Sequence, residues 1–243
     1  MADRGIGSHM PINDPTADLD WGRIEQELEE RGWATTGALL TAGERKQLVA
    51  GYDDDQLFRN RVVMARHGFG RGEYRYFAYP LPPLILELRQ AFYARLVPIA
   101  NRWRSKLGQE PLPSALDQFL EICHASGQSR PTPLLLRYRA GDYNCLHQDL
   151  YGEHVFPLQA AFLLSAPGSD FTGGELVLTE QRPRMQSRVS VVPLQVGEGV
   201  IFAVNHRPVQ GVRGAYRIAM RHGVSPIRTG SRHTLGIIFH DAA

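Results

Sequence analysis

The stretch LLLRYRAGDYNCLHQD, residues 134–149, marks the point where the pattern of apolar residues changes from helical to strand-like. Seven short runs typical of β-strands begin there, and Gly, Pro and Asp residues separate them. They are residues 134–138, 155–165, 175–179, 189–196, 200–204, 216–220 and 233–240. Short strands at this spacing indicate a sandwich or jelly roll. We therefore expect residues 133–243 to form a β-barrel core.

Upstream of this stretch the chain begins with shorter elements. Residues 20–31 predict a short helix, and residues 33–40 predict a strand. Thr41 and Glu44 have the spacing of a capping box, so a second helix is expected to begin after Thr41.

A longer helix is predicted further along, because apolar residues recur at spacings of three and four between Ile85 and Trp103. Pro98 lies inside this pattern and is expected to kink the helix or divide it. Ser114 and Asp117 then predict the start of another helix. Residues 20–132 are thus expected to form a mainly helical support for the barrel and to supply any lid.

The length of 243 residues suits one large domain, and no internal repeat or low-complexity linker divides it. Residues 1–19 read as a tag-like or flexible N-terminus, because residues 7–10, GSHM, resemble an expression remnant. We predict a single domain of the α+β class over residues 20–243.

The composition, with 43% hydrophobic and 21% charged residues, is that of a globular protein. No run of 18 apolar residues predicts a membrane-spanning helix, and no secretory leader is recognisable. Only Cys123 and Cys145 occur, which disfavours a disulfide scaffold and suits a reducing compartment. We therefore expect a cytoplasmic protein with no membrane partner.

The net charge of +2 conceals an uneven distribution. Residues 181–232 contain nine Arg, one Glu and neither Lys nor Asp, whereas the remaining residues sum to −6. Such a basic stripe can attract an anion or a nucleic acid, although a solvated loop face would explain it equally well. Seven of its arginines have no other predicted role, namely Arg182, Arg184, Arg188, Arg207, Arg213, Arg217 and Arg221.

Two histidines and one aspartate have the spacing of a metal site. His147 and Asp149 are two positions apart, so on a strand both side chains would point to the same face. With the distant His222 they would make a facial triad for Fe(II), which leaves three positions open for a 2-oxo acid and oxygen. Arg232, ten positions after His222, supplies a forked cation for the far carboxylate of such an acid.

The geometry of this pairing depends on the chain between the two residues. A hairpin with a three-residue loop at residues 229–231 would place Arg232 on the same face as His222. Thr234 lies two positions beyond Arg232, shares its face and would add a hydroxyl donor.

His206 is the main competitor of His222, but no basic residue lies ten positions after it. The other histidines lack a partner pattern or lie too near the end of the sequence, and we interpret them as structural. They are His67, His124, His154, His233 and His240.

The order of these motifs resembles that of the Fe(II)/2-oxoglutarate-dependent dioxygenases, in particular the prolyl-4-hydroxylase-like branch. His-x-Asp is followed by Gly-Gly-x-Leu at residues 173–176 and then by a His with a basic residue ten positions on. The chain is still more similar to a family of uncharacterised bacterial oxygenases that share stretches like residues 64–83, 130–157 and 170–188. That family carries an inferred assignment to oxidative demethylation of damaged nucleic acid.

The resemblance implies a double-stranded β-helix, a jelly-roll or cupin-like core. It also implies that His147, Asp149 and His222 hold the catalytic Fe(II), and that Arg232 binds 2-oxoglutarate, with O2 as the second co-substrate. Tyr138 would hydrogen-bond the 2-oxoglutarate, unless it is a barrel-lining core residue.

The aromatic stretch within residues 59–82 is the best candidate for a substrate lid. Its exposed aromatic rings would stack on unpaired bases and its arginines would contact phosphate, although a strand with one face in the core is the preferred interpretation. The candidates are Arg71, Tyr74, Arg75 and Tyr76, together with Asn144 beside the metal strand.

We thus expect an oxidoreductase, a dioxygenase that hydroxylates a C–H bond, and the resemblance implies that it is a demethylase in DNA repair. Two hypotheses for its substrate remain open, an alkylated base in nucleic acid and a peptide or free amino acid. The alternative of another class is a non-catalytic jelly roll that binds metal or a small acid. The sequence makes no prediction of oligomeric state.

Overall fold

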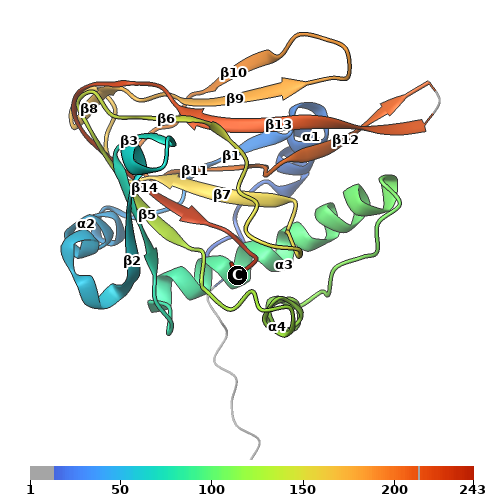
Figure 1. Cartoon of the computed structure of the whole chain (residues 1–243), viewed down its shortest axis with the longest axis horizontal. Helices are drawn as coiled ribbons and strands as arrows, with labels where there is room; N and C mark the ends of the chain where they lie inside the picture. The colour runs from blue at the N-terminus through green and yellow to red at the C-terminus, as the bar shows by residue number, and fades with distance from the viewer. Residues whose placement is uncertain (1–13, 213) are drawn as a thin grey trace, which may run out of the picture.

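The computed structural model describes residues 14–212 and 214–243, and in this part of the chain two antiparallel sheets lie face to face. Figure 1 shows the second sheet above the main sheet, with helix α3 running below the main sheet. This is the jelly-roll arrangement that the strand spacing predicts. Arg213 and most of the tag-like segment lie outside the described residues.

The main sheet has eight strands among the described residues. In spatial order they are β1 (Trp33–Ala38), β11 (Glu198–Ala203), β7 (Leu158–Leu163), β14 (Ile227–Ile237), β5 (Leu134–Arg139), β4 (Glu73–Phe77) and β2 (Phe58–Val63), with β8 (Phe171–Gly173) paired to β14. One face of this sheet packs on helices, and the other faces the second sheet.

The second sheet has six strands in the same part of the chain. They are β10 (Arg188–Val192), β9 (Leu176–Gln181), β13 (Gly214–Val224), β6 (Tyr143–His147) and β3 (Gly70–Arg71), with β12 (His206–Gly211) paired to β13. All seven predicted runs contain or overlap a strand of the two sheets.

Four α-helices and three single 3₁₀ turns complete the described structure. They are α1 (Trp21–Arg31), α2 (Ala42–Ala50), α3 (Pro83–Lys106) and α4 (Leu116–Ala125), with the 3₁₀ turns Gly51–Asp53, Asp55–Leu57 and Met64–Arg66. The capping box predicted for α2 is present, because Thr41 accepts from the backbone of Glu44 and the Glu44 carboxylate accepts from the backbone of Thr41.

Two helix predictions need correction. Helix α3 is not divided at Pro98, because the residues around the proline are buried against the main sheet and hold both halves in place, whereas the alternative of a kink stays a prediction. Helix α4 begins at Leu116, and its N-cap residue Ala115 makes no side-chain hydrogen bond, so Ser114 does not cap it.

The N-terminal half also supplies more strands than expected. Besides β1, which was expected and pairs with β11, strands β2 and β4 extend the main sheet beyond β5, and β3 pairs with β6 in the second sheet. The aromatic stretch therefore contains β3, β4 and most of β2, in agreement with the preferred interpretation of a strand with one face in the core. No described helix is long and apolar enough to cross a membrane.

The core has two layers that the main sheet separates. The larger cluster lies between this sheet and the helices and includes Phe92, Trp103 and Phe162. The smaller cluster lies between the two sheets and includes Tyr138 and Phe202. The smaller layer leaves room for a cavity, and the functional side chains gather there.

Candidate metal centre

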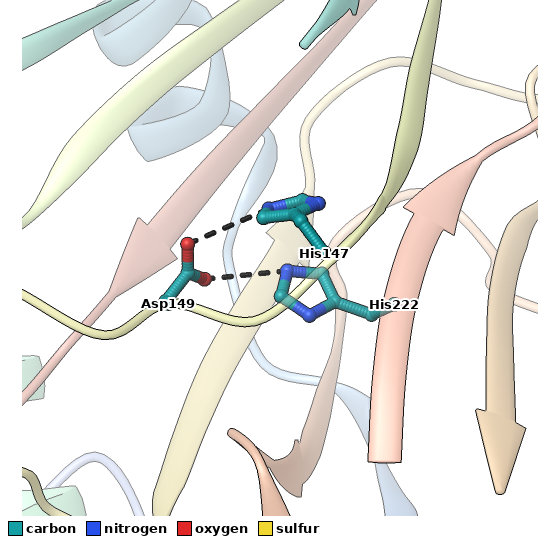
Figure 2. Close-up of side chains that lie close together, drawn as sticks. All are labelled: His147, Asp149 and His222. Carbon is teal, nitrogen blue, oxygen red and sulfur yellow. Dashed lines mark ion pairs between the residues drawn. The ribbon is translucent and has the colours of Figure 1, made fainter. Parts of the chain in front are cut away.

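The predicted metal ligands lie close together, because two of them stand on paired strands of the second sheet and the third follows one of these strands. His147 ends β6 and lies opposite His222 of β13 in the strand register, while Asp149 follows two residues after His147. His147 Nε2 lies 3.4 Å from Asp149 Oδ1, and His222 Nε2 lies 3.3 Å from Asp149 Oδ2. Figure 2 shows the carboxylate pointing at both imidazole rings.

The orientation of the rings suits metal binding. His147 Nδ1 donates to the Cys145 carbonyl at 2.8 Å, which leaves the Nε2 lone pair directed at the centre of the triad. The His222 ring packs against Phe202, with 4.8 Å between the ring centroids. Both imidazoles are thus held with Nε2 facing Asp149.

The carboxylate itself is held by two residues that sequence reasoning missed. The Tyr151 hydroxyl donates to Asp149 Oδ1 at 2.6 Å, and Gln159 Nε2 donates to Oδ2 at 2.8 Å. The signal for Gln159 was available, because it is the single polar residue in the apolar run LQAAFL of β7. Tyr151 lies in a loop, where no strand periodicity predicts its direction.

The charges of the three ligands are coupled. Although burial opposes it, the neighbouring His222 and His147 hold the pKa of Asp149 well below its usual range. Burial likewise opposes protonation of His147, but its hydrogen bond to Asp149 raises its pKa. Burial and the nearby His147 lower the pKa of His222. A negative carboxylate beside a neutral His222 is the ionisation state that a divalent cation requires.

The donor set fits a divalent iron. Two imidazole nitrogens and one carboxylate form the facial triad of non-haem iron oxygenases. The Nε2 atoms of His147 and His222 lie 3.4 and 3.3 Å from the two oxygens of one carboxylate, so a single ion can contact all three residues. All ligand atoms of the triad lie within 4.8 Å of one another.

A cavity of about 310 Å³ opens beside the triad between the two sheets. Most of its surface is apolar, a character typical of small-molecule sites. Besides the triad, its lining includes the predicted residues Tyr138, Arg232, Thr234, Asn144 and Tyr74.

Arg232 is the charged group that faces the cavity from the main sheet. It is 3% exposed and forms no ion pair with any described carboxylate. Its Nη1 donates to Thr234 Oγ1 at 2.6 Å, and its Nε has no partner in the described structure. A buried cation costs free energy unless an anion compensates it, so this site fits a ligand carboxylate.

The route by which Arg232 reaches the site differs from the prediction. Strands β13 and β14 do not form a hairpin: they belong to opposite sheets, and Ser225 and Pro226 connect them. Gly230 suggested a turn but lies inside β14, where an added Cβ would stand 1.9 Å from the Asp170 carbonyl. Arg232 therefore faces His222 across the cavity rather than along one strand.

The substrate candidates divide into two groups. Tyr74 and Asn144 line the cavity, and Asn144 Nδ2 lies 3.4 Å from the Tyr138 hydroxyl. Arg71, Arg75 and Tyr76 are not part of the lining.

The prediction that Arg75 contacts the substrate needs correction, because Arg75 lies on the opposite face of β4 from Tyr74. Its Nη1 donates to the Tyr52 carbonyl at 2.7 Å, and it also pairs with Asp55. Arg75 is therefore a structural residue of the helical side of the sheet.

The basic stripe is less available than its composition suggests. Arg207 is buried and pairs with Glu180 at 2.9 Å, and Arg188 pairs with the same carboxylate at 3.1 Å. Glu180 lies one position before residues 181–232, so the charge count of that segment did not include it. Arg213 lies outside the described residues.

Comparisons with known proteins identify the family to which the chain belongs. Residues 72–242 match the model of a family described as "Oxygenase, catalysing oxidative methylation of damaged DNA". Two uncharacterized proteins, from two strains of Mycobacterium tuberculosis, are each 52% identical to this chain over 168 residues. The matched region covers 69% of this chain and 72% of each relative.

Similarity to solved structures extends to the fold. A Trichoplax adhaerens prolyl hydroxylase, solved with a peptide fragment of the hypoxia inducible factor oxygen degradation domain, gives a TM-score of 0.56 at 15% identity, covering 91% of this chain and 89% of that chain. The non-haem α-ketoglutarate-dependent epimerase SnoN from nogalamycin biosynthesis gives 0.55 at 13% identity, covering 89% and 80%. A 2OG-Fe(II) oxygenase-family oxidoreductase from Burkholderia pseudomallei gives 0.51 at 16% identity, covering 93% and 94%. These similarities confirm the double-stranded β-helix core.

Proposed function

Because this chain belongs to the Oxygenase-NA family of oxygenases, whose model it matches over residues 72–242, we propose that it is an Fe(II)- and 2-oxoglutarate-dependent dioxygenase acting on alkylated bases in nucleic acid. The observation that carries this proposal is the placement of Arg232 and the triad in one cavity. The family's oxygenase assignment also disfavours a non-catalytic binding module.

His147, Asp149 and His222 would hold the iron. When bound, Fe(II) supplies the activation of O2, coupled to conversion of 2-oxoglutarate to succinate and CO2, that allows a C–H bond to be hydroxylated. The chain's own contribution is to fix the ligands: the Cys145 carbonyl orients His147, and Tyr151 holds the carboxylate oxygen of Asp149.

Arg232 would bind the far carboxylate of 2-oxoglutarate through its planar guanidinium, which matches a carboxylate with two parallel hydrogen bonds. Thr234 orients the guanidinium from the same strand face. Tyr138 lies opposite Arg232 in the β5–β14 register and is fully buried, so its hydroxyl adds a donor without admitting water.

The substrate assignment is supported by the family description and by the shape of the site. A methylated base must leave its stack to reach a buried metal, and an apolar cavity with a tyrosine wall suits such a base. Tyr74 supplies part of that wall. Hydroxylation of an N-methyl group gives a carbinolamine that releases formaldehyde, so the chain needs to provide positioning rather than a nucleophile.

The direct test combines two products. Wild-type protein with Fe(II), 2-oxoglutarate and an N-methylated single-stranded oligonucleotide is expected to yield equal amounts of succinate and formaldehyde, with the demethylated base detected by mass. His147→Ala should abolish both products, whereas His154→Ala, on the loop that follows the triad, should retain them. Succinate without a demethylated base would overturn the substrate assignment, and the same mass screen over peptides and amino acids would test that alternative.

A further inference from the structure

A row of aromatic side chains leads away from the triad along the cavity face of the main sheet. Tyr151 donates to Asp149, and its ring meets Tyr76 edge-on with 6.1 Å between centroids. The Arg59 guanidinium then lies over the Tyr76 ring, 4.5 Å from its centroid. Three side chains in contact therefore connect the metal carboxylate to a cation on the edge strand β2.

Arg59 is held in place while its charge remains available. Its Nε donates to the Pro131 carbonyl at 3.0 Å, and the Tyr76 ring supports one face of the guanidinium. No described carboxylate lies within ion-pair distance of it. Its terminal Nη groups make no hydrogen bond in the described structure and are not buried, so they can donate to a ligand.

Arg130 places a second positive charge beside the first. It directly precedes Pro131, the residue that anchors Arg59, and its backbone exchanges hydrogen bonds of 3.0 and 2.8 Å with Ala242. Its exposed side chain has no ion-pair partner among the described residues. The backbone of Arg130 is thus fixed, whereas its guanidinium is free.

The positive charges of Arg59 and Arg130 repel one another unless an anion compensates them. Burial and the charge of Arg130 lower the pKa of Arg59, although Tyr76 opposes the change. Asp241 also lies nearby, but it is already engaged by Arg89 at 2.8 Å and His124 at 2.9 Å. The pair Arg59 and Arg130 therefore lacks a compensating anion within the described structure.

We propose that Arg59 and Arg130 form a phosphate-binding rim that grips the backbone of a single-stranded nucleic acid whose modified base enters the cavity. This inference rests on the proposed function and names the surface that recognises its polyanionic substrate. The rim lies outside the basic stripe, two of whose arginines, Arg188 and Arg207, are paired with Glu180.

The rest of the cavity lining suits the same ligand. Phe69 and Leu146 also line the cavity and are 48% and 47% exposed. Exposed aromatic and apolar groups stack on bases without regard to sequence, while cations track the phosphates. Bases that flank the modified one would pack on Phe69 and Leu146, and their phosphates would reach Arg59 and Arg130.

The test measures how binding of a fluorescent methylated oligodeoxynucleotide depends on salt, by anisotropy. The double variant Arg59→Gln with Arg130→Gln is expected to bind about tenfold more weakly at 100 mM salt. The slope of log affinity against log salt should shrink by about 1.4, because each lost phosphate contact on a single strand removes about 0.7. Arg59→Lys with Arg130→Lys should restore most of the slope.

The matched control is Arg95→Gln with Arg102→Gln, which removes two surface charges from α3 on the other side of the main sheet. This control should bind like the wild type, and circular dichroism of all variants checks their folding. If the wild type binds and the Arg59/Arg130 glutamine variant has the same salt slope, the rim is wrong while the proposed function stands. If the wild type does not bind the oligonucleotide at low salt, both proposals fail.

Discussion

At the scale of single residues, the chemistry depends on contacts that hold the metal ligands still. One oxygen of Asp149 accepts a hydrogen bond from Tyr151 at 2.6 Å, and the other accepts one from Gln159 at 2.8 Å. A ligating carboxylate that is hydrogen-bonded in this way presents its remaining lone pair in a fixed direction.

Tyr151→Phe should weaken metal binding without unfolding the protein, because only one hydroxyl is removed from a ring that keeps its packing against Tyr76. Partners of this kind typically change metal affinity by about 10- to 100-fold. Anaerobic titration calorimetry with Fe(II), or with Mn(II) as a stable substitute, measures the effect. Tyr143→Phe, at an exposed tyrosine of β6, is the control, and equal affinities of both variants would contradict the role of Tyr151.

Arg232→Lys should raise the KM for 2-oxoglutarate by about one to two orders of magnitude, because lysine keeps the charge but loses the paired hydrogen bonds of the guanidinium. Fe(II) affinity should change little, since Arg232 donates to Thr234 and to no triad residue. A succinate assay at varied 2-oxoglutarate measures the KM. An unchanged KM with reduced kcat would show that the carboxylate binds elsewhere.

The residue scale is also where the sequence was most informative. The triad is predicted from the spacing of His147 and Asp149, from the basic residue ten positions after His222, and from the order of motifs that resembles the dioxygenases. Gln159 gives a weaker signal, because it is the single polar residue in the apolar run of β7. Tyr151 gives none, because its role depends on how a loop packs in space, and no short-range pattern encodes that packing.

At the scale of elements, the decisive arrangement is the exchange of strands between sheets. Strand β13 carries His222 in the second sheet, and β14 carries Arg232 in the main sheet, so two adjacent strands supply opposite walls of the cavity. The hairpin prediction was wrong because glycine at residue 230 has two possible causes, a turn or a close strand. The approach of β8 is the actual cause.

Residues 238–242 fasten the end of the main sheet to the helices through a buried ion pair. Arg89 and Asp241 are fully buried and 2.8 Å apart, and the same carboxylate accepts from Tyr79 and contacts His124. Removing one member of a buried pair leaves the other charge without compensation.

Asp241→Asn should therefore lower the free energy of unfolding by about 3 kcal/mol. The surface pair of Arg102 and Glu25 provides the control, because Glu25→Gln should cost less than about 1 kcal/mol. Urea unfolding of both variants at pH 7 gives the comparison. Equal costs for the two substitutions would show that the buried pair adds no more than a surface pair.

At the scale of the whole molecule, stability should depend on pH through buried histidines. Burial and the nearby Arg89 lower the pKa of His240 from 6.5 to about 4. As the pH falls, His240 is therefore protonated near pH 6.5 in the unfolded chain but only near pH 4 in the folded chain. The contribution of neutral His240 to the free energy of unfolding is fully present above pH 6.5 and is lost as the pH falls toward 4.

Between pH 6.5 and 4, this single histidine should lower the free energy of unfolding by on the order of 3 kcal/mol. His240→Gln removes the titration and keeps an oxygen that can accept the Phe156 N–H, which now donates to His240 Nδ1 at 3.3 Å. Urea unfolding at several pH values between 4 and 7 should give a flatter profile for the variant than for the wild type. Parallel profiles would exclude His240 as a source of the acid sensitivity.

The strands that precede residue 72 have a consequence for any shortened version of this enzyme. Strands β1, β2 and β3 pair with β11, β4 and β6, so each of them caps a strand of the matched region. A fragment limited to residues 72–243 would present three unsatisfied rows of backbone donors and acceptors, which template association between chains. Light scattering should reveal such a fragment as aggregates, and β6, which carries His147, would be among the strands left open.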